Sequence, residues 1–197
     1  MVKSYLKSKK KHKKINKVSR THKTNDKTLT KTFKYINYYQ PEYYIKPNGF
    51  WYDINNMGAK YGQMNFGKYK VEVLFNEKLL TRDLDINKYT NKILLLDNLD
   101  NILKFNKLYS IIKKDKIPSN LSFTNNEGQD GYNIHTYIKW KTVSKHYAGI
   151  EFRNFNELKP KINLNFNDNF WYTSIDFDSG CIWNLKMLKN YIKIKKI

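Results

Sequence analysis

The stretch "KILLLDNLDNILKFN", residues 92–106, joins a strand pattern directly to a helix pattern. Its apolar run up to Leu96 predicts a central strand that is buried on both faces. Asp97 or Asn98 can cap a following helix. Apolar residues three and four positions apart predict that this helix continues to about Ile112. The stretch therefore indicates a domain that contains both a sheet and helices.

The segments around it extend this mixed pattern. Alternation of apolar and polar residues, together with turn signals, predicts further strands. They are a short strand from Thr32 and strands at 49–54, 69–75, 150–155 and 171–178. The spacing at 140–147 predicts a short helix, with Gly149 in the usual C-terminal cap position. Ser179-Gly180 is typical of a turn, and the polar span 113–133 is typical of a long surface loop.

Length and composition favour one domain of α+β class. The chain has 197 residues, 40% of them apolar and 16% aromatic, which is enough to build a core around large rings. We expect about six or seven short strands in a mixed or antiparallel sheet, with two or three helices. The irregular order of these elements is unlike a doubly wound parallel sheet. No apolar run reaches the roughly 20 residues that cross a bilayer, so we predict no membrane partner.

The N-terminal segment differs from the rest of the chain. Residues 1–31 are lysine-rich and lack apolar periodicity, so we predict a disordered basic arm before a domain at 32–197. Its densest cluster comprises Lys9, Lys10, Lys11, Lys13 and Lys14. Such a cluster can neutralise nucleic-acid phosphates or serve in nuclear import. An AT-rich genome would produce the same lysine bias without any such function.

Candidate chemistry lies mainly in acidic residues on predicted strands. Phosphate-binding, dinucleotide-binding and metalloprotease motifs are missing from the sequence, and we predict no metal site. Cys181, the single cysteine, excludes an internal disulfide, indicates a reducing intracellular compartment and is typical of a small buried side chain. Asp176 and Asp178 share the polar face of one predicted strand, and Glu151 lies on another. These acids could divide acid and base roles, or they could form salt bridges on a sheet face.

Four stretches together resemble a family of small proteins from large DNA viruses, phages and some bacteria. They are "KPNGFWYD", "KILLLDNLDNILKFN", "IKWKTVSKHYAGIEF" and "FWYTSIDFDSGCIWN", within residues 32–184. The family pattern has a KP-x-G-x-W block, a later Y-x-G-I-E block and a terminal S-G-C-I-W-N block. The resemblance implies a viral-type protein that acts in the host cytoplasm or nucleus, or in the virion.

The layout of this family is similar to that of the ADP-ribosyltransferases, whether active or degenerate. In that fold an early strand supplies a His or Arg that holds NAD, a second strand supplies an aromatic or hydroxyl residue, and a later strand supplies a Glu. The resemblance implies Tyr52 for the second role and Glu151 for the third. Trp51, Asp176 and Asp178 are further candidates to line the same cleft. In the early segment "TKTFKYIN", Lys34 stands where the His or Arg is expected. The alternative is a non-enzymatic nucleic-acid-binding or virion-associated protein that acts through the basic arm.

Overall fold

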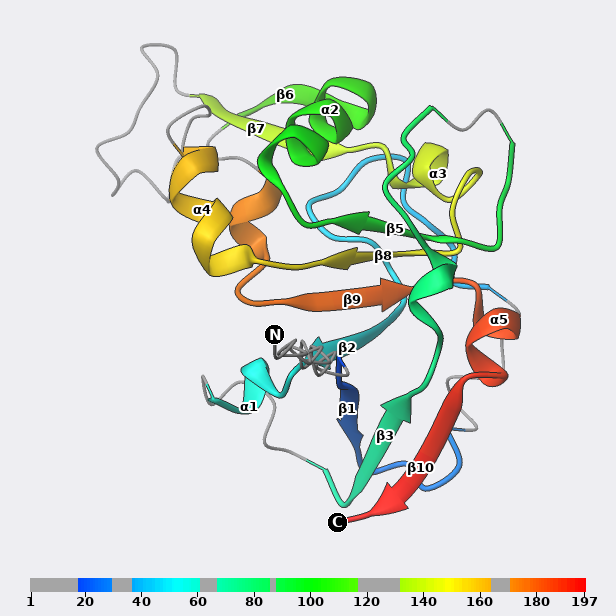
Figure 1. Ribbon diagram of the computed structural model, residues 1–197. Helices are drawn as coiled ribbons and strands as arrows, with labels where there is room; N and C mark the ends of the chain where they lie inside the picture. Colours follow the sequence, from blue (N-terminus) through cyan, green and yellow to red (C-terminus); the bar gives the residue numbers. More distant parts are fainter. Residues whose placement is uncertain (1–17, 30–36, 61–66, 86–87, 117–131, 164–170) are drawn as a thin grey trace, which may run out of the picture.

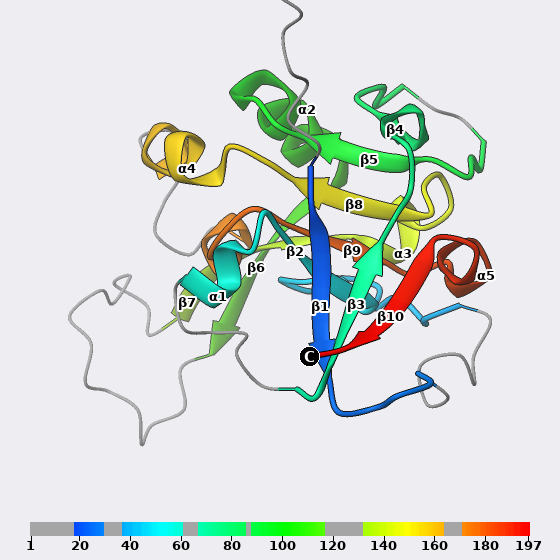
Figure 2. The same cartoon turned by 60° about the horizontal axis from the view of Figure 1, so that its bottom comes forward.

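The computed structural model describes residues 18–29, 37–60, 67–85, 88–116, 132–163 and 171–197, and its centre is a curled mixed sheet (Figure 1). The strand order is β10 (Ile192–Lys196), β3 (Tyr69–Val73), β1 (Arg20–Thr24), β2 (Phe50–Ile54), β9 (Ser179–Ile182), β8 (Gly149–Phe152), β5 (Ile93–Leu96) and β4 (Leu80–Thr81). The pairs β4–β5 and β5–β8 are parallel, and the remaining pairs are antiparallel. Figure 2 shows that β1, β3 and β10 run steeply across the strands of the other half. The predicted α+β class and mixed sheet are confirmed.

Helices and a hairpin cover one side of the sheet around β5 and β8 (Figure 1). The helical elements are α1 (Met57–Lys60), α2 (Leu99–Tyr109), α3 (Trp140–Val143), α4 (Phe155–Asn163) and α5 (Leu185–Lys189), with 3-10 turns η2 (Glu77–Leu79) and η3 (Trp171–Ser174). The separate hairpin pairs β6 (Ser110–Lys116) with β7 (Tyr132–Ile138). Within the described part of the chain, no helix has the length and hydrophobicity that crossing a bilayer requires.

The predicted strand and helix at 92–106 are confirmed. All four side chains of β5 are buried, because β5 lies between two strands and helices cover one of its faces. The Asn98 side chain caps α2 by accepting a hydrogen bond from the backbone nitrogen of Asn101 at 2.9 Å. Ile102, Phe105 and Tyr109 form the buried stripe of the helix. The helix ends at Tyr109 rather than near residue 112, because the chain continues directly into β6.

The prediction of a strand at 171–178 is wrong. Trp171 and Tyr172 are adjacent in sequence yet both are buried, which a half-buried strand does not permit. They lie in the 3-10 turn η3, where their rings meet edge to face at 5.4 Å and pack into the helix-side core. Ser179-Gly180 is no turn either, because both residues belong to strand β9. The alternation at 171–178 suggested a strand incorrectly, because Trp171 and Tyr172 are both buried and burial here does not follow a period of two.

Two further local predictions need correction. Residues 113–116 and 132–133 belong to the β6–β7 hairpin rather than to a loop, and the intervening residues lie outside the described ranges. Gly149 is not a helix cap, because it opens strand β8 opposite Ile182. A Cβ at Gly149 would lie 2.7 Å from the backbone oxygen of Cys181, so the close approach of strands β8 and β9 requires glycine there.

The predicted disordered arm of residues 1–31 is wrong for residues 18–29. Residues 20–24 form strand β1, which pairs with both β2 and β3 inside the sheet. The sequence lacks apolar alternation here, because Arg20 occupies an inward-facing position of the strand and ion pairs balance its buried charge. The lysine cluster at 9–14 and the strand predicted from Thr32 lie outside the described residues. The folded domain therefore begins before residue 32.

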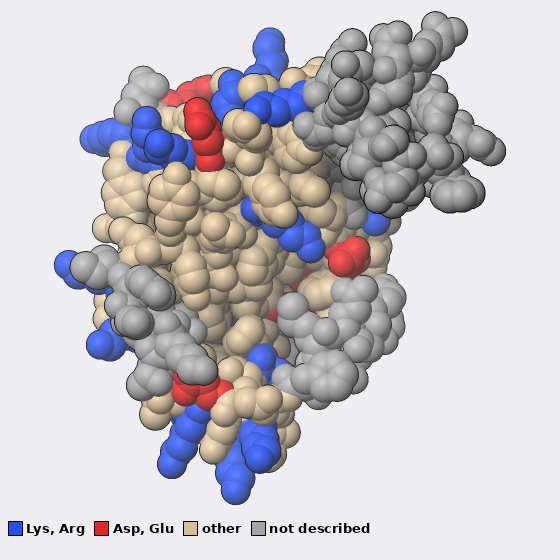
Figure 3. Space-filling model, turned by 180° about the vertical axis from the view of Figure 1, so that it is seen from behind, with Lys and Arg blue, Asp and Glu red and all other residues tan. Residues whose placement is uncertain are grey.

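Part of the positive charge of the described domain gathers at the edge strand β10. Lys193, Lys195 and Lys196 are exposed there, and the Lys195 ammonium pairs with Glu72 of β3 at 2.9 Å. Figure 3, which views the molecule from behind, shows Lys and Arg side chains at the lower end, where Figure 1 places β10. Exposed lysines on an edge strand also discourage pairing with another sheet.

Candidate functional site

Strand register places Tyr52 and Glu151 on either side of one glycine. Tyr52 of β2 lies opposite Gly180 of β9, and Gly180 lies opposite Glu151 of β8. Residues directly opposite one another in a sheet point to the same face. Because Gly180 has no side chain, the Tyr52 ring lies over it, and the Tyr52 hydroxyl donates a hydrogen bond of 2.6 Å to Glu151 Oε2. The two residues that the sequence resemblance singled out are thus in direct contact.

Arg20 joins this pair from strand β1. It lies opposite Ile54, two residues after Tyr52, so it points to the same face of the sheet. Its Nε donates to Glu151 Oε2 at 2.8 Å, and its Nη2 donates to Glu151 Oε1 at 3.2 Å. Both side chains are buried, with exposed fractions of 3% for Arg20 and 0% for Glu151. The guanidinium also lies over the Phe75 ring, 4.1 Å from its centroid.

A second arginine and a second glutamate complete the cluster. Arg153, two residues after Glu151, donates from Nε to Glu151 Oε1 at 2.6 Å. Glu77 of η2 bridges the two guanidinium groups, with Oε1 accepting from Arg20 Nη2 at 2.5 Å and Oε2 from Arg153 Nη2 at 2.8 Å. Glu77 is 53% exposed, whereas Arg153 is 18% exposed. Glu151 is therefore the buried carboxylate of the cluster and Glu77 the outer one.

Burial and charge set the protonation of these groups. Burial, followed by the charge of Glu151, raises the pKa of the Tyr52 hydroxyl well above its usual value, so Tyr52 is a neutral donor. Burial opposes the charged form of Glu77, but hydrogen bonds from Arg20 and Arg153 outweigh it and lower the pKa of Glu77. Burial also opposes the charge of Arg20, yet its contacts with Glu151 and Glu77 raise its pKa. The cluster thus holds two cations and an anionic Glu77 around Glu151.

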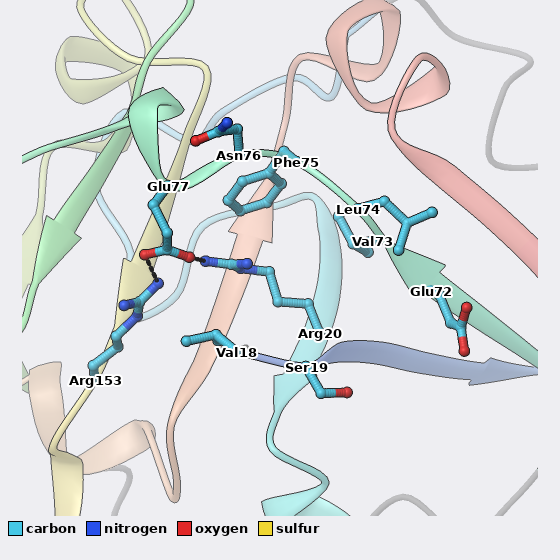
Figure 4. Close-up of a pocket in the computed structure, with 10 residues that line it drawn as sticks. All are labelled: Val18, Ser19, Arg20, Glu72, Val73, Leu74, Phe75, Asn76, Glu77 and Arg153. Atoms are coloured by element: carbon cyan, nitrogen blue, oxygen red, sulfur yellow. Dashed lines mark hydrogen bonds and ion pairs between the residues drawn. The ribbon is translucent and has the colours of Figure 1, made fainter. Parts of the chain in front are cut away.

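A cavity of about 790 Å³ opens beside the outer side of the cluster (Figure 4). Its lining is Val18, Ser19, Arg20, Glu72, Val73, Leu74, Phe75, Asn76, Glu77 and Arg153. Figure 4 shows Glu77 between the two guanidinium groups, at one end of the cavity. Glu151 and Tyr52 do not line the cavity, because the arginines and Glu77 cover them. The volume is in the range that small-molecule sites have.

The other residues expected near Tyr52 and Glu151 lie elsewhere. Trp51 points to the opposite face of β2 and packs against the helix-side core. Asp178 accepts hydrogen bonds from the backbone nitrogens of Asn154 and Phe155, at 3.2 and 2.8 Å, where α4 begins. Asp176 is exposed. None of the three lines the cavity, and Lys34 lies outside the described residues.

Cys181 occupies the opposite face of β9 from the cluster. It is buried and free, and burial raises the pKa of its thiol well above the usual value. Its Sγ lies 3.9 Å from the backbone oxygen of Pro47. These surroundings disfavour the reactive thiolate form, so packing accounts for this residue.

The arrangement suits the recognition of an anion and the stabilisation of a cation. Guanidinium groups present several donors to phosphate oxygens, whereas the Glu151 carboxylate can stabilise positive charge that develops nearby. Among the described residues, no group of three or more His, Cys, Asp or Glu side chains is placed to hold a metal ion. Comparisons with protein-family models, with curated proteins and with solved structures find no match to this chain.

Proposed function

We propose that this domain binds NAD and transfers its ADP-ribose group, with Arg20, Tyr52 and Glu151 as the central residues. The observation that carries the proposal is their meeting across strands β1, β2 and β8 through direct hydrogen bonds. The sequence resemblance implied a cationic residue on an early strand, an aromatic or hydroxyl residue on a second and a glutamate on a later one. Arg20 supplies the first from a segment where the sequence pattern had indicated no strand.

The chemistry of NAD fits these groups. Cleavage of the bond between the ribose C1′ and the nicotinamide nitrogen gives the electron pair to nicotinamide and leaves positive charge on the ribose. A buried carboxylate such as Glu151 stabilises an oxocarbenium-like centre of this kind. An acceptor nucleophile then forms the new bond to C1′ and releases its proton. Arg20 and Arg153 can hold the pyrophosphate oxygens, since guanidinium groups form paired hydrogen bonds with phosphates.

NAD binding is the direct test of this proposal. Millimolar NAD is expected to raise the melting temperature of the protein, because a ligand that binds the folded state stabilises it. Arg153→Gln is expected to weaken NAD binding about tenfold or more, since a hydrogen bond to a charged group contributes about 1.5–3 kcal/mol. Thermal shift and calorimetry measure both effects, and transfer from labelled NAD reports activity.

Arg82→Gln is the matched control for this experiment. Arg82 is an equally charged arginine that pairs with Asp97, and neither residue lines the cavity. Its substitution is expected to leave NAD affinity unchanged. A melting temperature that does not respond to millimolar NAD would contradict the proposal, and binding without transfer would reduce it to a degenerate transferase.

A second candidate function is nucleic-acid binding through the lysine cluster at 9–14. The observation that favours it is charge, because residues 1–34 carry 13 of the 37 basic residues and one of the 17 acidic ones. Deletion of residues 1–17, which leaves β1 intact, is expected to remove most nucleic-acid affinity and flatten its salt dependence. Filter binding at several salt concentrations measures this, and equal affinity and salt dependence in the shortened protein would contradict it.

A further inference from the structure

We infer that Glu77 is an internal counter-anion that occupies a pyrophosphate-binding site between Arg20 and Arg153. Its carboxylate contacts both guanidinium groups from the cavity side, in the position that a bound phosphate oxygen would take (Figure 4). The inference deepens the proposed function and rests on it for the dinucleotide that would carry the pyrophosphate. The anion site itself depends only on the described side chains.

Charge balance defines this site. Two guanidinium groups face two carboxylates, and Glu151 neutralises one positive charge from the buried side. Without Glu77 the cluster would present one unbalanced positive charge and several free N–H donors to the cavity. Such an arrangement attracts an anion, and paired arginines suit phosphate oxygens in particular. Glu77 supplies that anion from within the chain.

Exposure makes Glu77 the replaceable partner. Its side chain is 53% exposed and extends from the three-residue turn η2, so it can leave the arginines by rotating its own bonds. Water screens the half-exposed Glu77 carboxylate and so weakens its attraction to the two arginines. Glu151, by contrast, is fully buried and is also bound by Tyr52. An incoming pyrophosphate therefore displaces Glu77 and leaves Glu151 in place.

Displacement of Glu77 would also control access of a ribose to Glu151. Arg20, Arg153 and Glu77 separate the Glu151 carboxylate from the cavity. A ribose reaches Glu151 only when this cover rearranges. Pyrophosphate binding would remove Glu77 and draw the two guanidinium groups toward the ligand, so the site would open only when the dinucleotide is present.

Calorimetric titration of the full chain with inorganic pyrophosphate, at fixed ionic strength, tests the inference. Glu77→Gln is expected to bind pyrophosphate about tenfold more tightly than the unmodified protein. Adding Arg153→Gln to that variant is expected to remove the gain. Glu72→Gln is the matched control, because Glu72 also lines the cavity but pairs with Lys195. Lysines elsewhere contribute the same background to every variant.

The outcomes separate this inference from the proposed function. Equal pyrophosphate affinity in Glu77→Gln and the unmodified protein, or an equal gain in Glu72→Gln, would overturn the inference. A parallel titration with NAD reports on the function. If Glu77→Gln leaves the NAD affinity unchanged, the proposed function stands and the inference is overturned. Tighter pyrophosphate binding in Glu77→Gln without any NAD binding supports the inference and removes the function.

Discussion

Glu151→Gln is expected to lower the free energy of unfolding by about 3–5 kcal/mol, because it breaks a buried ion pair and leaves two arginines with only the half-exposed Glu77 as a carboxylate partner. Arg20 is 3% exposed and would then lie beside a neutral amide. The amide oxygen can still accept hydrogen bonds, but its NH₂ group would face N–H donors of Arg20 or Arg153. Urea unfolding of the variant and the unmodified protein measures the difference.

Two further variants test whether burial of the ion pair causes this loss of stability. Asp85→Asn removes an exposed ion pair with Lys104 and is expected to cost no more than about 1 kcal/mol. Replacing Arg20 with Met and Glu151 with Leu together is expected to cost less than Glu151→Gln alone, since the buried charge of Arg20 is then removed together with that of Glu151. A loss below 1 kcal/mol for Glu151→Gln would contradict the buried ion-pair network. Transfer of ADP-ribose from labelled NAD is also expected to be lost in Glu151→Gln, measured under conditions in which this variant remains folded.

Predictions from the sequence succeeded where burial follows a simple period. The run at 93–96 is buried along its whole length, and the helix after it begins at its predicted cap, Asn98. The alternation from residue 69 likewise corresponds to β3, in which Val71 and Val73 are buried. The pattern failed at 171–174, where neighbouring aromatic rings are all accommodated in a large core. Period alone cannot distinguish a strand from a turn that is buried on every side.

The candidate site was half predictable. Tyr52 and Glu151 came from the sequence resemblance, whereas Arg20 and Glu77 come from segments 57 positions apart that only the fold brings together. One signal in the sequence could have found the arginines. The chain has three arginines among 37 basic residues, and all three form ion pairs with carboxylates. Against a bias toward lysine, each arginine marks a place where paired hydrogen bonds matter.

Gly180→Ala is expected to destabilise the protein through the same cluster. A Cβ at Gly180 would lie 2.2 Å from the Tyr52 hydroxyl oxygen, which is inside the contact distance of any two heavy atoms. Overpacking of a buried site costs about 1–3 kcal/mol. Displacing the Tyr52 hydroxyl from Glu151 would add about 1–3 kcal/mol, because a buried polar group loses its partner. Chemical unfolding of the variant measures the combined loss.

A double-mutant cycle isolates the contact between Tyr52 and Gly180. Tyr52→Ala is expected to cost at least about 1 kcal/mol less in the Gly180→Ala protein than in the unmodified protein, which is the coupling typical of residues in contact. The cost falls because the new methyl group fills space that the ring has left. Gly149→Ala is the matched control, since its Cβ would meet Cys181 and Ile182 rather than Tyr52. The costs of Gly149→Ala and Tyr52→Ala are expected to add within about 0.5 kcal/mol. Additive costs for Gly180→Ala and Tyr52→Ala would instead mean that the ring does not cross strand β9 at Gly180, and the direct path from Tyr52 to Glu151 would be lost.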